Sequence, residues 1–218
     1  MTQRMTLMRS TLGMLLLAAL LFVPLFATRG AGAFDFWWWI SANLLVLLAL
    51  VQIVDGPWRR ELVADVREQF GRKVVLGLLS AAALYVVFWV GNQFCRALFV
   101  RAGSDISAVY AFKEQAPTLR ILLLMIFIIG PGEELFWRGF LQRRLQAELS
   151  GPLGFLAATG VYALVHVASG NPILVLAAGV CGFFWGWLYL RYRSMLLNVI
   201  SHTAWDVAVF LLFPLGGT

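Results

Sequence analysis

The chain has 218 residues, of which 61% are hydrophobic and 13% are charged. Soluble domains carry about 25% charged residues, so this composition excludes an ordinary water-soluble protein and predicts that most of the chain lies in lipid. The formal net charge of +6 would suggest nucleic-acid binding in a soluble protein, but in a membrane protein the placement of Lys and Arg carries the information.

Hydrophobic runs long enough to cross a membrane recur along the whole chain. A bilayer core about 30 Å thick is crossed by about 20 apolar residues, and about seven such runs can be counted, with six or eight as the alternatives. The runs cover approximately residues 12–27, 36–54, 74–99, 119–136, 153–167, 173–190 and 195–213. The predicted fold class is therefore an all-α, polytopic transmembrane helix bundle.

The first run permits two interpretations. Arg4 and Arg9 precede it and Ala31-Gly32-Ala33 follows it, which together resemble a signal peptide with its cleavage site. The apolar core of a signal peptide is normally about 7 to 15 residues long. This run is longer, so the sequence favours an uncleaved first span.

The segment 57–73, between the second and third runs, predicts an amphipathic helix. Trp58, Leu62, Val66 and Phe70 recur every four residues, and charged residues fill the other faces. Such a helix is predicted to lie at the cytosolic surface of the membrane. An ordinary solvated connector is the alternative interpretation.

Lys and Arg residues fall mainly on alternate loops. If the N-terminus is cytosolic, the outer loops hold only Arg29, Arg101 and Lys113, whereas eleven basic residues lie on the inner side. The eleven are Arg4, Arg9, Arg59, Arg60, Arg67, Arg72, Lys73, Arg143, Arg144, Arg191 and Arg193. Because cytosolic loops are enriched in Lys and Arg, we expect a multi-pass protein of the cell (inner) membrane with a cytosolic N-terminus.

A small set of ionisable residues is expected inside the apolar runs. The set consists of Glu133, Glu134, Arg138, His166, His202 and Asp206. A polar group in hydrocarbon costs several kcal/mol unless it is paired, so each of these residues is a candidate for function. Hydrogen bonds that merely tie helices together are the alternative explanation.

The spacing of these residues predicts how they are arranged. Glu134 and Arg138 lie four residues apart and are expected to form an ion pair on one helical face. Glu133 points about 100° away around the helix, which leaves its carboxyl group free for chemistry. Gly130-Pro131-Gly132, just before the acids, is expected to weaken or break the helix, so that the carboxylates begin a new segment that lines a cavity.

Two further pairs repeat the four-residue spacing, Tyr162 with His166 and His202 with Asp206. Counting about 1.5 Å of rise per residue places the acids and His166 about 10 Å apart in depth. Helix tilt absorbs only part of this difference.

Three stretches together resemble the motifs of one family. Residues 133–138 fit the pattern EExxxR, residues 162–166 approximate FxxxH with Tyr in place of Phe, and residues 202–206 fit HxxxN/D. In this order, on three spans, they resemble the CAAX-processing and bacteriocin-processing intramembrane proteases, whose eukaryotic members are the type II CAAX prenyl endopeptidases. The resemblance divides the chain into N-terminal membrane helices with the amphipathic helix, 1–110, and a protease core, 111–218.

The resemblance implies a role for each catalytic candidate. Glu133 would be the general base that activates a water, and His166 would help to hold that water. His202 and Asp206 would stabilise the oxyanion. An ionised Asp206 cannot donate a hydrogen bond, so it would have to be protonated or would act by orienting His202.

Glu134 and Arg138 would support the site or bind substrate. No metal cofactor is favoured, because the chain has only two histidines and no HExxH motif. Zinc or another divalent metal held by Glu133, His166 and His202 is the alternative. Cys95 and Cys181 lie in apolar runs, which favours packed thiols over a disulfide.

The predicted function is that of an intramembrane endopeptidase. It would cut a membrane-anchored peptide or protein in a cavity open toward the cytosol. Its partners would be that substrate and the lipid bilayer, and no nucleic acid. A non-catalytic membrane scaffold or immunity protein of the same fold is one alternative. A proton-coupled transporter is another, against which the absence of inverted repeats counts.

Overall fold

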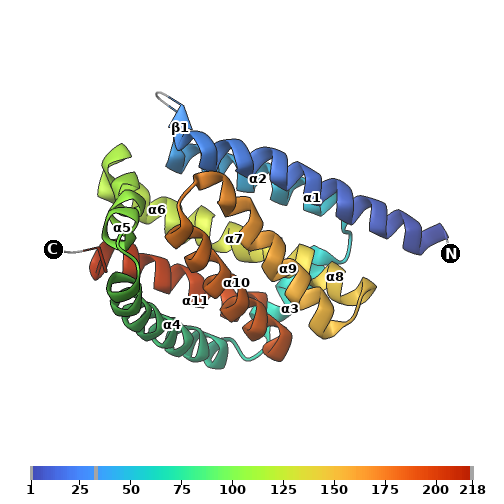
Figure 1. Ribbon diagram of the computed structural model, residues 1–218. Helices are drawn as coiled ribbons and strands as arrows, with labels where there is room; N and C mark the ends of the chain where they lie inside the picture. Colours follow the sequence, from blue (N-terminus) through green and yellow to red (C-terminus); the bar gives the residue numbers. More distant parts are fainter. Residues whose placement is uncertain (1, 32–33, 217–218) are drawn as a thin grey trace.

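A computed structural model describes residues 2–31 and 34–216, which form a bundle of helices with one short antiparallel ribbon (Figure 1). The first half contains α1 (Thr2–Thr28), β1 (Gly30–Ala31), β2 (Phe34–Asp35), α2 (Phe36–Val54), α3 (Trp58–Arg67), α4 (Phe70–Leu98), α5 (Ala102–Tyr110) and the 3-10 helix η1 (Ala111–Gln115). The predicted all-α bundle is confirmed. The suggested cleavage site at Ala31-Gly32-Ala33 falls mostly outside the described residues.

The second half contains α6 (Thr118–Leu124), α7 (Gly130–Phe136), α8 (Arg143–Glu148), α9 (Gly151–His166), α10 (Pro172–Tyr192) and α11 (Met195–Asp206). Between or after these lie the π-helical segments η2 (Met125–Ile129), η3 (Trp137–Gln142) and η5 (Val207–Leu212), and the 3-10 helix η4 (Val167–Ser169).

Six helices in the described part of the chain are long and apolar enough to cross a membrane. They are Met8–Thr28, Phe36–Val54, Phe70–Leu98, Gly151–Ser169, Pro172–Tyr192 and Met195–Leu212. Each coincides with one of the seven predicted runs. The remaining run, 119–136, is also helical, but it is divided among α6, η2 and α7.

The chain stays helical from Thr118 to Glu148, although π-helical turns interrupt the α-helical pattern twice. Pro131 stands in the first turn of α7, directly after the π-helical segment η2, and it has no N–H to bond to the preceding turn. The expected weakening at Gly130-Pro131-Gly132 thus takes the form of a π-helical turn, a feature often found at functional sites. A new α-helical segment with both glutamates begins after it, as predicted.

A close approach between α7 and α11 fixes where these glutamates lie. A methyl group at Gly130 would overlap the Thr203 side chain and would lie 3.1 Å from Thr203 Cα. Only glycine leaves room for this contact. It brings α7 against the turn of α11 that carries His202.

The predicted amphipathic helix over 57–73 is shorter than expected. It forms α3, which ends at Arg67, and Gln69 turns the chain with a left-handed backbone (φ 48°) before Phe70 begins α4. Trp58 is buried, whereas the charged face of α3 is exposed. The helix is therefore amphipathic over 58–67, and its place at the cytosolic surface stays a prediction.

The two ends of the bundle differ in chemistry. At one end, here called the basic end, Asp55 at the C-terminus of α2 pairs with Arg143 and Arg144 of α8. Arg193, in the turn between α10 and α11, donates to Gln146 at the same end. The N-terminus of α1 also lies toward this end (Figure 1).

The opposite end, here called the α5 end, gathers α5, η1, the start of α2 and the turn between α9 and α10 (Figure 1). Arg120 pairs with Asp35 there. The Asn171 side chain donates to the Asp105 carbonyl at 2.7 Å, which ties the α9–α10 turn to α5.

Candidate functional site

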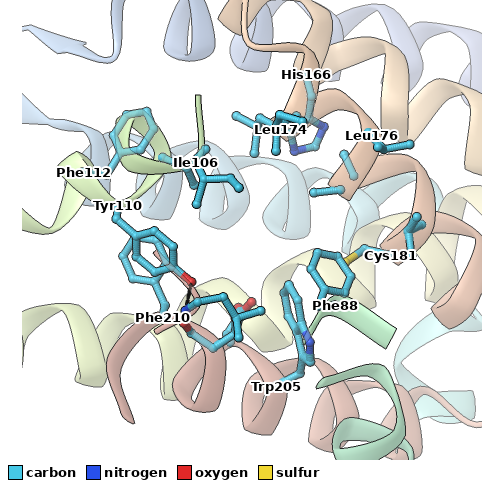
Figure 2. A pocket seen from close by; sticks show the side chains of 18 of the residues that line it. Phe88, Ile106, Tyr110, Phe112, His166, Leu174, Leu176, Cys181, Trp205 and Phe210 are labelled. Atoms are coloured by element: carbon cyan, nitrogen blue, oxygen red, sulfur yellow. Dashed lines mark hydrogen bonds between the residues drawn. The ribbon is translucent and has the colours of Figure 1, made fainter. Parts of the chain in front are cut away.

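A cavity of about 350 Å³ lies inside the bundle, walled by residues that include members of α1, α2, α4, α5, α7, α9, α10 and α11. Four candidate residues predicted from the sequence line it: Glu133, His166, His202 and Asp206. Figure 2 shows the wall that carries His166 and the opposite wall with Phe88 and Trp205. The structure thus brings two of the candidate acids, Glu133 and Asp206, and both imidazoles to a single cavity.

Glu133 has one occupied and one open carboxylate oxygen. Its side chain is buried, and its Oε2 accepts a hydrogen bond of 2.7 Å from the Tyr162 hydroxyl. Within the described part of the chain, Oε1 has no hydrogen-bond partner. The Tyr162 ring is itself held between Trp137 and the guanidinium of Arg138, so the hydroxyl fixes the direction in which Glu133 points.

Glu134 faces away from the cavity and is fully engaged. Its Oε1 accepts from Arg138 Nη1 and from His202 Nδ1, each at 2.7 Å, and its Oε2 accepts from Asn198 Nδ2 at 3.0 Å. Asn198 also donates to the Trp185 carbonyl at 2.7 Å. The predicted ion pair between Glu134 and Arg138 therefore forms, and it belongs to a buried network that extends to α11.

Asn198 belongs to this network, although it was not predicted from the sequence. It is fully buried, and its amide is the donor that occupies the second oxygen of Glu134. A signal was present, because Asn198, His202 and Asp206 follow one another at intervals of four and share one face of α11.

His202 lies between two carboxylates. Its Nδ1 is bonded to Glu134, and its Nε2 is 3.4 Å from Asp206 Oδ2. The ring stacks on Trp185 at 3.6 Å between centroids, with 20° between the planes. An imidazole with a carboxylate facing each nitrogen suits the doubly protonated form, which donates on both sides.

His166 is oriented by the backbone. Its Nδ1 lies 2.8 Å from the Tyr162 carbonyl oxygen, which can only accept, so Nδ1 carries the proton. In a neutral ring Nε2 is then an acceptor. Tyr162 links the two candidate residues, because its carbonyl oxygen contacts His166 while its hydroxyl donates to Glu133. The hydroxyl that distinguishes Tyr162 from the Phe of the motif therefore contacts the candidate base directly.

The described residues contain no group of three or more His, Cys, Asp or Glu side chains placed to hold a metal ion. Glu133, His166 and His202 line one cavity. The expectation that no metal is favoured and the alternative of a metal held by these three residues both stay predictions. Cys95 and Cys181 are free and both line the cavity, so the expectation of unpaired thiols is confirmed.

The cavity lies toward the α5 end. Its lining includes Phe36 and Trp37 at the start of α2, Ile106 in α5, and Leu174 near the start of α10. The basic end is the opposite one. The cytosolic N-terminus and a cavity open toward the cytosol both stay predictions.

Residues 115–208 match the family model described as type II CAAX prenyl endopeptidase Rce1-like. This segment contains all six candidate residues. No curated protein and no solved structure shows significant similarity to the chain.

Proposed function

Since residues 115–208 match the family model of type II CAAX prenyl endopeptidases, we propose that this membrane protein is an endopeptidase that uses Glu133 to activate water. Its substrate would be a peptide bond in a membrane-associated peptide or protein. The observation that carries the proposal is the contrast between the two adjacent acids. Glu134 is saturated with donors, whereas Glu133 keeps one oxygen open beside the cavity.

A water in the cavity can be held between Glu133 and His166. The open carboxylate oxygen accepts one of its protons, and Nε2 of a neutral His166 accepts the other. The Tyr162 hydroxyl keeps the carboxylate in place while this happens. The lone pair of the water is then directed at a peptide carbonyl in the cavity.

The proposed hydrolysis needs only the water, the peptide bond and Glu133 to transfer its protons. The water oxygen attacks the carbonyl carbon as one of its protons passes to Glu133. The carbon–nitrogen bond of the tetrahedral intermediate then breaks, and Glu133 returns the proton to the leaving nitrogen. The products are a new carboxyl terminus and a new amino terminus.

His202 and Asp206 are proposed to act on the negative charge of the intermediate. A doubly protonated His202 at the cavity supplies the positive charge that an oxyanion needs. Of the two roles open to Asp206, the 3.4 Å separation from His202 Nε2 favours orientation of the imidazole. Glu134 and Arg138 do not line the cavity, so their proposed role is to support His202 from behind.

The Glu133→Gln variant tests this function. The substitution keeps the shape and removes the base, so we expect processing to stop while the protein remains folded. The readout is a comparison of membrane-protein termini in cells that carry the native chain, Glu133→Gln, or the matched control Glu68→Gln, whose side chain is exposed after α3. Unchanged termini in the Glu133→Gln cells would defeat the enzyme and leave the scaffold alternative.

A further inference from the structure

The position of the cavity within the bundle bears on the side from which substrate arrives. Its lining comes from the half of the bundle toward the α5 end: Phe36 and Trp37 begin α2, His166 ends α9, and Leu174 lies near the start of α10. His202 forms part of its floor, about 10 Å along α11 from the basic end at 1.5 Å per residue.

The charges of the two ends are unequal. Of the 17 Lys and Arg residues, eleven lie in the segments of the basic end. Five lie in the segments of the α5 end, namely Arg29, Arg96, Arg101, Lys113 and Arg120, and Arg120 is paired with Asp35. An excess of Lys and Arg marks the cytosolic side of a membrane protein, which assigns the α5 end to the extracytosolic side.

We propose that the cavity opens to the extracytosolic half of the membrane and takes an apolar peptide segment of an exported, membrane-anchored protein. This inference rests on the proposed function and names the substrate class for the same site. A peptide bond can reach an extracytosolic cavity only if its protein has been moved across the membrane. An apolar membrane anchor close to that peptide bond keeps the bond within the membrane.

The lining favours an apolar segment. Aromatic and aliphatic side chains dominate it, among them Phe88, Tyr110, Phe112 and Phe210 (Figure 2). No Lys or Arg of the described chain lines the cavity. A segment with several acidic side chains would therefore find no Lys or Arg to pair with, whereas an apolar one would bury its surface favourably.

The cavity also reaches the outer surface between two helices. Val87 of α4 and Leu176 of α10 both line it, yet their side chains are 48% and 51% exposed. In a bilayer this surface faces lipid. An anchored apolar segment can thus pass sideways from lipid to the cavity without crossing water.

Thiol labelling tests the orientation directly. In a chain whose natural cysteines are replaced, Cys95→Ser with Cys181→Ser, a single cysteine is introduced at exposed Ser104 of α5 or, as the matched control, at exposed Arg59 of α3. Intact bacterial cells are treated with a membrane-impermeant maleimide before and after permeabilisation. We expect the Ser104→Cys protein to react in intact cells and the Arg59→Cys protein only after permeabilisation. The reverse pattern would overturn the proposal.

The substrate class is tested by the termini that depend on Glu133. We expect them on exported proteins, at the extracytosolic end of an apolar anchor. Glu133-dependent termini on cytosolic proteins, or at cytosolic ends of anchors, would overturn the substrate class while leaving the enzyme intact. If no terminus depends on Glu133, the proposed function fails and the substrate class fails with it, whatever orientation the labelling shows.

Discussion

The adjacent acids Glu133 and Glu134 should respond differently to the same substitution. Glu134→Gln removes the carboxylate that neutralises Arg138, whose side chain is 3% exposed. The other polar contact of that guanidinium is a 3.5 Å approach to the Gly182 carbonyl. Breaking a buried ion pair from one side costs about 3–5 kcal/mol, and we expect the free energy of unfolding to fall by this amount.

Glu133→Gln should have little effect on stability. The glutamine oxygen can still accept from the Tyr162 hydroxyl, and the substitution removes a buried negative charge that has no ion-pair partner among the described residues. We expect the free energy of unfolding to change by less than about 1 kcal/mol. Cleavage should nevertheless stop, because the base is gone.

The assay is an unfolding titration of the purified variants in mixed micelles, followed by the fluorescence of the nine tryptophans. Adding Arg138→Met to Glu134→Gln should recover part of the lost stability, since the uncompensated charge is removed. Equal destabilisation by the two glutamine variants, or a larger loss for Glu133→Gln, would refute the division of roles between the acids.

Further predictions concern the surroundings of the site. Tyr162→Phe removes the hydroxyl that donates to Glu133; a hydrogen bond to a charged group contributes about 1.5–3 kcal/mol, so cleavage should slow about 10- to 150-fold, and an unchanged rate would show that the hydroxyl does not position the base. Gly130→Ala should lower stability in the same titration by about 1–3 kcal/mol through overlap with Thr203, and Thr203→Ala in the same chain should restore part of it. Leu176→Trp should reduce cleavage without loss of stability, because its half-exposed side chain stands where the cavity meets lipid; normal cleavage would count against sideways access. Metal chelators should leave cleavage unchanged, whereas a loss that added zinc restores would favour the metal-dependent alternative.

The sequence predicted the helices well where apolar composition alone decides the structure. The run over 36–54 coincides with α2, because lipid requires every backbone group to be bonded within a helix. The run over 119–136 differs. Its residues are equally apolar, but η2 and the close contact of Gly130 with Thr203 divide it. Amino-acid composition does not indicate which neighbouring helix packs against a given turn.

For the site, spacing predicted pairs within one helix but not contacts between helices. The Glu134–Arg138 pair followed from the interval of four residues. The bond from Tyr162 to Glu133 joins residues on α9 and α7, and the role of Asn198 depends on how α11 packs. These contacts are set by the packing of helices far apart in sequence, which no local pattern encodes.

The geometry of α7 explains how an acid can remain unpaired inside a membrane. Neighbouring residues of a helix point about 100° apart, so Glu133 and Glu134 necessarily face different surroundings. The contact at Gly130 brings His202 and Asn198 close enough to join Arg138 around Glu134. Because Arg138 is paired with Glu134, it makes no ion pair with Glu133. Its open oxygen therefore stays available to the cavity, and the same network that stabilises the bundle preserves the group proposed to activate water.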